Sequence, residues 1–191
     1  MKSKIEIPWK RYALIAELAK RLDPISPQFG KTALQKLVFF LQEIYQIDCG
    51  YDFELYSYGP FDSQLLNDLD LIDNWGCVSV NRVNDTFAGY RIRPTETVDS
   101  IRKKATEFLD NGKTKQALDD LVSNYGEMTA KNLELRATTV FIASDLQKKD
   151  EPSDKEKICY IVGKIKPKFT KQEIEEAAKE LIEKGHLKIR S

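Results

Sequence analysis

Residues 32–46 have the sequence TALQKLVFFLQEIYQ, and this stretch decides the fold. Its apolar side chains recur at helical spacing and form one face, made of Leu34, Leu37, Val38, Leu41 and Tyr45. Phe39 and Phe40 widen this face, so we expect a helix that is buried on most of its sides. Thr32 and Gln35 have the spacing of a capping box, in which two side chains satisfy the free amides of the first turn. The stretch therefore predicts a largely buried helix from Thr32 to about Gln46.

The neighbouring segments predict the elements of a winged helix. The expected order is helix, helix, short strand, helix and hairpin, over about Trp9 to Leu22, Thr32 to Gln46, Tyr51 to Tyr58, Asp62 to Trp75, and the two arms Cys77 to Val83 and Phe87 to Arg93. Gly59-Pro60 is expected to stop the strand, and Asn84-Asp85 to form the turn of the hairpin.

The second half of the chain has mostly helical spacing. Five helices are expected, over about Val98 to Leu109, Ala117 to Tyr125, Thr129 to Leu146, Ser153 to Ile165, and Thr170 to Lys184. Ser153 with Glu156, and Thr170 with Glu173, have the spacing of capping boxes. A short strand over Leu187 to Arg190 would complete a second helix-turn-helix unit.

The predicted fold class is mainly α (α+β), with a winged-helix-like half that contains a small β-hairpin and a helical half. We expect a domain over residues 1–95 and a helical domain over residues 96–191 packed on it, with one continuous domain as the alternative. Hydrophobic residues make up 41% of the 191 residues, which is enough for a sizeable core.

Charge and cysteine content indicate a cytoplasmic protein. Lysine and arginine together number 30, as do aspartate and glutamate, so no net charge attracts the chain to nucleic acid or to an anionic membrane. No apolar run approaches the ~20 residues that span a bilayer. Residues 1–10 lack the apolar centre of a signal peptide. Cys49, Cys77 and Cys159 are odd in number and have no C-x-x-C spacing, which favours reduced thiols.

Motifs that carry catalysis are missing from the sequence. His186 is the single histidine, so a site with two histidine ligands is excluded. Neither a phosphate-binding G-x-x-x-x-G-K-[ST] loop nor a G-x-S-x-G turn occurs. We therefore expect a non-catalytic protein without a metal or cofactor. Glu134 and Arg136 lie among apolar residues, so we expect one of them to be partly buried in a structural ion pair.

The charge map argues against conventional DNA binding. The helix before a wing usually enters the major groove, but the segment from Asp62 to Trp75 has four aspartates and no lysine or arginine. Phosphate contacts supply much of the affinity for a duplex, so this helix would be repelled. We expect instead a protein partner that binds an acidic and aromatic face. Its residues would be Tyr56, Tyr58, Phe61, Asp62, Asp68 and Asp70.

A DNA-binding regulator with an unconventional surface remains the alternative. Basic residues gather in the wing and before the last helix. They are Arg82, Arg91, Arg93, Lys164, Lys166, Lys168 and Lys171. No membrane partner is expected.

Two segments resemble a known family. Leu34-Gln35-Lys36-Leu37-Val38-Phe39-Phe40-Leu41-Gln42 is similar to the L-Q-K-L-x-[YF] helix of the YwgA-like proteins and of the related SocA-like antitoxin domain called Panacea. Tyr56-Ser57-Tyr58-Gly59-Pro60-Phe61-Asp62-Ser63 resembles the Y-x-Y-G-P turn that follows that helix there. The match is closer to the YwgA-like proteins and covers about Lys31 to Val80. Because Panacea domains resemble antitoxins that neutralise varied toxins, the resemblance implies a protein-binding module.

Overall fold

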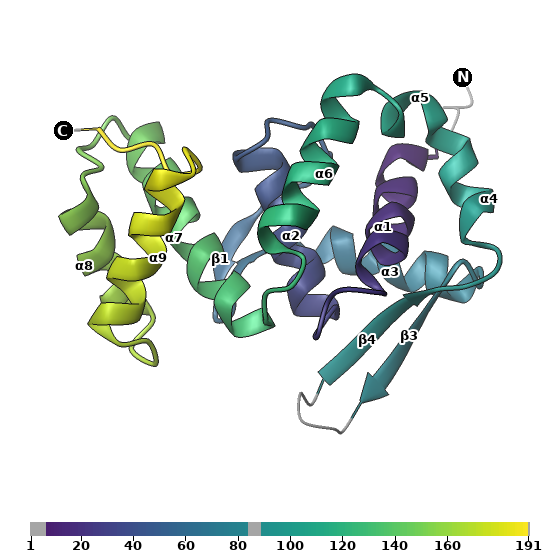
Figure 1. Ribbon diagram of the computed structural model, residues 1–191, viewed down its shortest axis with the longest axis horizontal. Helices are drawn as coiled ribbons and strands as arrows, with labels where there is room; N and C mark the ends of the chain where they lie inside the picture. The colour runs from purple at the N-terminus through teal and green to yellow at the C-terminus, as the bar shows by residue number, and fades with distance from the viewer. Residues whose placement is uncertain (1–6, 84–88, 191) are drawn as a thin grey trace, which may run out of the picture.

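The computed structural model describes residues 7–83 and 89–190, which form a mainly helical α+β fold with two small antiparallel sheets (Figure 1). The first elements are α1 (Trp9–Leu22), α2 (Lys31–Glu43), β1 (Glu54–Tyr56), β2 (Gly59–Phe61), α3 (Ser63–Asn74), β3 (Val78–Val83) and β4 (Gly89–Pro94). The following elements are α4 (Val98–Arg102), the 3-10 helix η1 (Lys103–Ala105), α5 (Thr106–Leu109), α6 (Gly112–Tyr125), α7 (Ala130–Lys148), α8 (Lys155–Ile165) and α9 (Lys171–Glu183). The predicted class, mainly α with a small hairpin, is confirmed.

Helix α2 is largely buried, as its apolar pattern predicts. Nine successive residues, 33–41, are shielded from solvent. The helix contacts α6, α7, β2 and β4, so it lies between the hairpins and the later helices. The buried apolar side chains form one cluster that draws on both halves of the chain. The boundary near residue 95 therefore stays a prediction.

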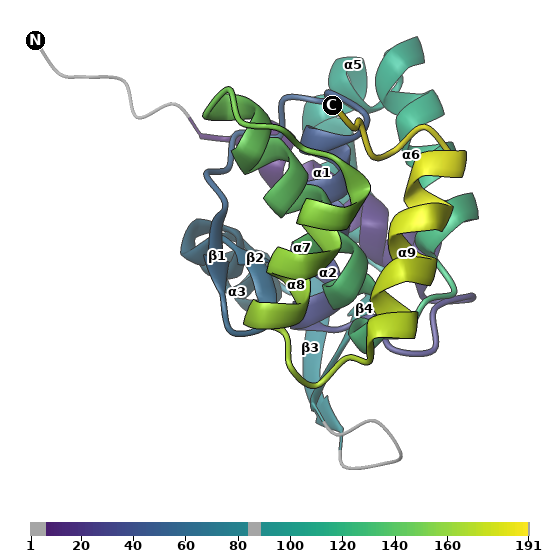
Figure 2. The ribbon, with the colours of Figure 1, turned by 90° about the vertical axis from the view of Figure 1, so that its left-hand side faces the viewer.

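The long helix α7 connects the two ends of the molecule. It contacts α2 and β2 on one side and α8 and α9 on the other. Figures 1 and 2 show α8 and α9 as a pair at one end, while the β3–β4 hairpin projects from the other part of the molecule. None of the described helices is both long and apolar enough to cross a membrane.

The aromatic strand is shorter than predicted and belongs to a tight hairpin. The strand ends at Tyr56, just before the expected stop at Gly59-Pro60, but these two residues also begin β2, which pairs antiparallel with β1. Gly59 has φ of 88°, and this left-handed conformation lets the chain return after two residues. The second hairpin pairs Val78 with Pro94 at its base. Its predicted turn, Asn84-Asp85, lies outside the described residues.

Two of the predicted caps differ from those in the structure. Thr32 lies inside α2, whose cap residue makes no side-chain cap bond. Ser153 is buried and its backbone pairs with that of Arg190, so the neighbouring Asp154 caps α8. This single bridge replaces the strand expected over residues 187–190. The capping box of Thr170 and Glu173 on α9 is confirmed.

The helix expected over residues 98–109 is divided into α4, η1 and α5. Ala105 has φ of −136° and ψ of 39°, outside the helical region, and this interrupts the ladder of backbone hydrogen bonds.

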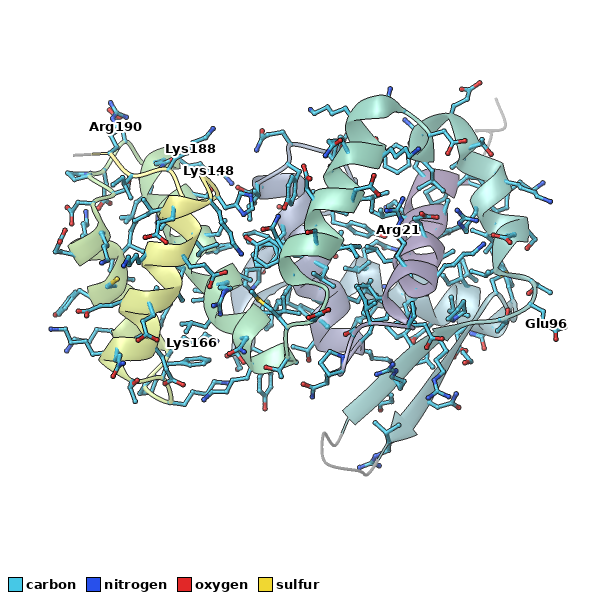
Figure 3. All side chains as sticks on the ribbon, viewed as in Figure 1. Arg21, Glu96, Lys148, Lys166, Lys188 and Arg190 are labelled. Atoms are coloured by element: carbon cyan, nitrogen blue, oxygen red, sulfur yellow. The ribbon has the colours of Figure 1, made fainter. Side chains whose placement is uncertain are left out.

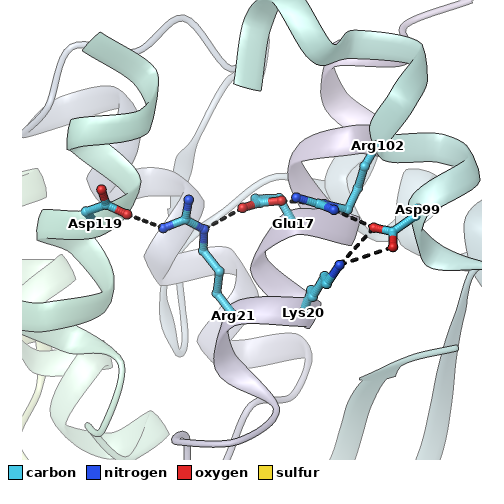
Figure 4. Close-up of polar contacts among 6 residues, drawn as sticks. All are labelled: Glu17, Lys20, Arg21, Asp99, Arg102 and Asp119. Carbon is cyan, nitrogen blue, oxygen red and sulfur yellow. Dashed lines mark hydrogen bonds and ion pairs between the residues drawn. The ribbon is translucent and has the colours of Figure 1, made fainter. Parts of the chain in front are cut away.

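A network of ion pairs fastens α1 to the later helices (Figure 4). Buried Glu17 on α1 accepts hydrogen bonds from Arg21 and from Arg102 of α4. Arg21 also pairs with Asp119 of α6, and Arg102 pairs with Asp99. A buried carboxylate is retained only when its charge is compensated, so these arginines allow Glu17 to face the interior. The network has the structural role of joining α1, α4 and α6.

Candidate interaction surface

Residues 56–61, called the aromatic turn below, place two tyrosines in solvent. The side chains of Tyr56 and Tyr58 are 56% and 65% exposed at the tip of the β1–β2 hairpin. Phe61 is half buried, with its ring centroid 5.2 Å from that of Tyr56. The three aromatic residues predicted for a partner-binding face therefore gather at one place.

The base of the aromatic turn is held by α2. The Gln35 side chain donates to the carbonyl of Asp62 at 2.7 Å and accepts from its amide at 2.9 Å. Lys36 Nζ donates to the Pro60 carbonyl at 2.7 Å. These bonds satisfy backbone groups that the two-stranded hairpin leaves free. They also give the two quoted motifs a shared structural role, since the Gln-Lys pair of the helix anchors the Gly-Pro turn.

The tip of the aromatic turn is held by the chain between α8 and α9. Lys166 is only 4% exposed, and its Nζ donates to the carbonyl of Ser57 and contacts Glu134 Oε1 at 3.0 Å. Lys168 Nζ lies 2.7 Å from the other carboxylate oxygen of Glu134. The expected buried ion pair at Glu134 is thus confirmed, and it joins α7 to the aromatic turn.

Lys36 and Lys166 bring two buried ammonium groups close to one carboxylate. Burial lowers the pKa of Lys36 to about 7; the charge of Glu134 raises this pKa and that of Lys166 lowers it further. Burial disfavours a charged amine, and the carboxylate of Glu134 does not offset that cost for Lys36. The aromatic turn is therefore held by a cluster whose charge depends on pH.

Gly59 allows the close approach of the aromatic turn to α7. A Cβ at this position would lie 3.0 Å from Thr138 Oγ1 and 3.3 Å from Lys36 Cε. Together with its positive φ, this crowding restricts the position to glycine. A pocket of about 360 Å³ opens beside the turn, lined by Tyr56, Tyr58 and residues of α2.

Two of the three aspartates predicted for the exposed acidic face, Asp62 and Asp68, are buried, so the prediction is wrong for them. Asp68 is 2% exposed and pairs with Arg11 at 2.8 Å, while Tyr51 donates to it at 2.9 Å. Asp62 is buried and accepts from the amides of Asp52 and Gln64 as the cap of α3. These carboxylates face inward because other parts of the chain supply donors for them. Burial, and then the charge of Asp68, raise the pKa of Tyr51.

Asp70 is the remaining aspartate of the predicted face, and it is exposed. Its carboxylate pairs with Lys31 of α2 at 3.2 Å. The exposed part of the predicted face is therefore mainly aromatic.

The basic residues of the alternative prediction do not form one surface. Arg91 is bound to the carbonyls of Ser26, Pro27 and Asp23, so it fastens β4 to the loop after α1. Arg82 and Arg93 are exposed on the β3–β4 hairpin, whereas Lys166 lies at the α8–α9 end, as Figure 3 shows. Lys166 and Lys168 compensate Glu134, and Lys171 pairs with Glu175. Among the described residues this leaves Lys164 as the exposed member near α8 and α9 without an ion pair.

His186, which follows α9, is half buried. Its Nδ1 lies 2.6 Å from the hydroxyl of Tyr125, and its ring packs edge-on against Tyr45. Burial, with a contribution from the charge of Lys184, lowers the pKa of His186. Among the residues that the structure describes, no group of three or more His, Cys, Asp or Glu could hold a metal ion.

Comparison with known proteins found no protein-family model and no curated protein that matches this chain. The resemblance to the YwgA-like and Panacea proteins stays a prediction based on the two quoted motifs.

Gln35 and Lys36 were not among the residues predicted for this site. The sequence carried a signal for them, because they are the two polar residues within the otherwise apolar stretch 33–41. A polar side chain in such a position must find a partner inside the fold.

Proposed function

We propose that this protein is a non-catalytic, antitoxin-like regulatory module that binds a protein partner through the aromatic turn. The observation that carries the proposal is the exposure of Tyr56 and Tyr58 on a turn held by buried contacts with α2, α7 and the chain after α8. Tyrosines are enriched at energetically important positions of protein interfaces. The resemblance to antitoxin-like domains points to the same function.

The rigid support of the turn strengthens the proposal. Association is penalised by the ordering of loops and side chains, so a preorganised contact surface keeps more of its binding energy. The backbone of the aromatic turn is held at Ser57 by Lys166 and at Pro60 by Lys36. Asp62 and Asp68 take part by positioning the turn and α3, and Asp70 is the acidic residue available at the edge of the face.

The fold is compatible with this function. We interpret α1, α2, α3 and the β3–β4 hairpin as a winged-helix-like unit, with α8 and α9 as a second helix-turn-helix. A helix α3 without lysine or arginine suits a protein partner better than a DNA groove.

Comparative capture tests the proposal. Immobilised wild type and a Tyr56→Ser, Tyr58→Ser double variant are exposed to the same host extract, and bound proteins are quantified by mass spectrometry. The matched control is Tyr90→Ser, which changes a tyrosine exposed on the other hairpin. We expect at least one protein to be retained by the wild type and the control and lost from the double variant. Identical capture by all three proteins would refute the proposal.

DNA binding through the wing is the second candidate. It is favoured by the exposure of Arg82 and Arg93 along the β3–β4 hairpin, and Lys164 and Lys171 would be additional contacts. Phosphate contacts make such binding steeply dependent on salt. Fluorescence anisotropy with a mixed-sequence duplex tests it, and absence of binding at low salt would eliminate it.

A further inference from the structure

A groove between α8 and α9 lies next to the aromatic turn. It has a volume of about 710 Å³, and its apolar lining includes Cys159, Pro167, Phe169 and Ile174. Tyr160 stands at its edge with 67% of its surface exposed. This groove is separate from the pocket beside α2, and none of the residues that the structure describes fills it.

Lys168 and Phe169 connect the groove to the aromatic turn. Lys168 Nζ lies 5.1 Å from the centroid of the Tyr58 ring and 5.3 Å from that of Phe169. Phe169 is also part of the groove lining. The exposed tyrosines and the groove therefore form one strip that runs along the α8–α9 end of the molecule.

The strip combines aromatic rings with ammonium groups. Lys164 Nζ lies 5.4 Å from the centroid of the Tyr160 ring at the groove edge. Of the four lysines along the strip, Lys168 pairs with Glu134 and Lys171 with Glu175. Lys155 and Lys164 make no ion pair with any residue that the structure describes. The rim therefore offers positive charge beside apolar surface.

We propose that the partner's contact segment is acidic and apolar, and that it extends from the aromatic turn across Lys168 and Phe169 into the groove between α8 and α9. This inference rests on the proposed function and names the chemistry of the partner. Carboxylates of the segment pair with Lys155 and Lys164, while its apolar side chains enter the groove. Such charge complementarity selects partners and accelerates their association.

A protein segment fits the strip better than a nucleic acid. The groove floor is apolar, and Glu156 and Glu175 stand on its two walls. A continuous phosphate backbone would meet these carboxylates, whereas a peptide can place its acidic residues only where the lysines are. The charge pattern thus favours an acidic peptide over a polyanion of uniform charge.

Selection from a displayed library of random peptides tests the inference. Full-length protein is immobilised, enriched peptides are synthesised, and their affinities are measured by fluorescence anisotropy. We expect enriched peptides to carry Asp or Glu beside aromatic or aliphatic residues. We expect Lys164→Glu to weaken them about tenfold or more, since it reverses a rim charge. The matched control is Lys179→Glu, an exposed lysine on α9 outside the groove, and it should leave binding unchanged.

Cys159 supplies an independent readout of groove occupancy. Cys49 and Cys77 are buried, whereas Cys159 is half exposed and lines the groove. A bound peptide should therefore slow alkylation of Cys159 by a maleimide, measured by mass spectrometry.

The inference would be overturned by failure to enrich any peptide, by enrichment without acidic residues, by equal effects of the two charge reversals, or by unchanged labelling of Cys159. If Tyr58→Ser abolishes peptide binding but Lys164→Glu does not change it, this inference is overturned and the proposed function still stands. If single-stranded DNA of mixed sequence displaces the peptides and protects Cys159 from alkylation, the strip binds a nucleic acid and the proposed peptide ligand is wrong.

Discussion

Lys36 makes the stability of the protein depend on pH in a predictable direction. Burial lowers its pKa to about 7 in the folded protein, whereas a lysine in an unfolded chain has a pKa of about 10.4. Between these values the unfolded chain binds more protons than the folded one, so stability rises with pH. The stability that depends on neutral Lys36 is fully present above the pKa of this lysine in the unfolded chain. It is lost as the pH falls through this window toward the pKa of Lys36 in the folded protein.

The size of the effect follows from the two pKa values. Integration of the proton linkage from about pH 7 to about pH 9 gives a gain of about 2 kcal/mol in the free energy of unfolding. The measurement stops there because burial raises the pKa values of Tyr51 and Tyr125. Those tyrosines contribute stability that is present below their unfolded pKa and is lost as the pH rises through about 10.

Urea denaturation of wild type and Lys36→Met across this range is the assay. Methionine has a similar length and carries no charge, so the variant should lack the contribution of Lys36. From about pH 7 to about pH 9, the free energy of unfolding of the wild type should rise by about 2 kcal/mol relative to that of Lys36→Met. Lys179→Met, which removes an exposed lysine on α9, is the control and should follow the wild type. Parallel profiles for wild type and Lys36→Met would refute the reasoning.

Three further predictions concern the same structure. Glu134→Gln leaves buried ammonium groups uncompensated and should lower the free energy of unfolding by about 3–5 kcal/mol in urea denaturation; a loss below about 1 kcal/mol would contradict it. Gly59→Ala forces a side chain to adopt φ of 88° against Thr138 and should cost at least about 1–2 kcal/mol, measured by thermal unfolding. His186 should titrate below its usual pKa of about 6.5 because burial disfavours its charged form. Its ring resonances in NMR will show this, and a midpoint above that value would contradict it.

The sequence predicted best those features that depend on neighbours along the chain. The apolar spacing of residues 34–41 identified a buried helix, and Thr170 with Glu173 formed the expected capping box. In both, the deciding groups lie within a few residues of one another. The limits of α1 were predicted for the same reason, since Pro24 and Pro27 follow its last turn.

The candidate site was predicted less well because its partners are distant in sequence. Gln35 resembled a capping residue, yet its amide bonds to Asp62, 27 residues later. Asp68 has the sequence context of an exposed helix face, but Arg11 and Tyr51 supply donors that draw it inward. The contact of Lys166 with the aromatic turn spans more than 100 residues. No local pattern encodes such contacts, which depend on how the helices pack.

The central claim is that Tyr58 on the aromatic turn contacts a protein partner. Isothermal titration calorimetry of the captured partner against wild type and Tyr58→Ala tests it most directly. An interface tyrosine of this kind should contribute about 2 kcal/mol or more, which corresponds to about 30-fold weaker binding in the variant. Equal affinities for the two proteins would contradict the claim and place the contact elsewhere on the molecule.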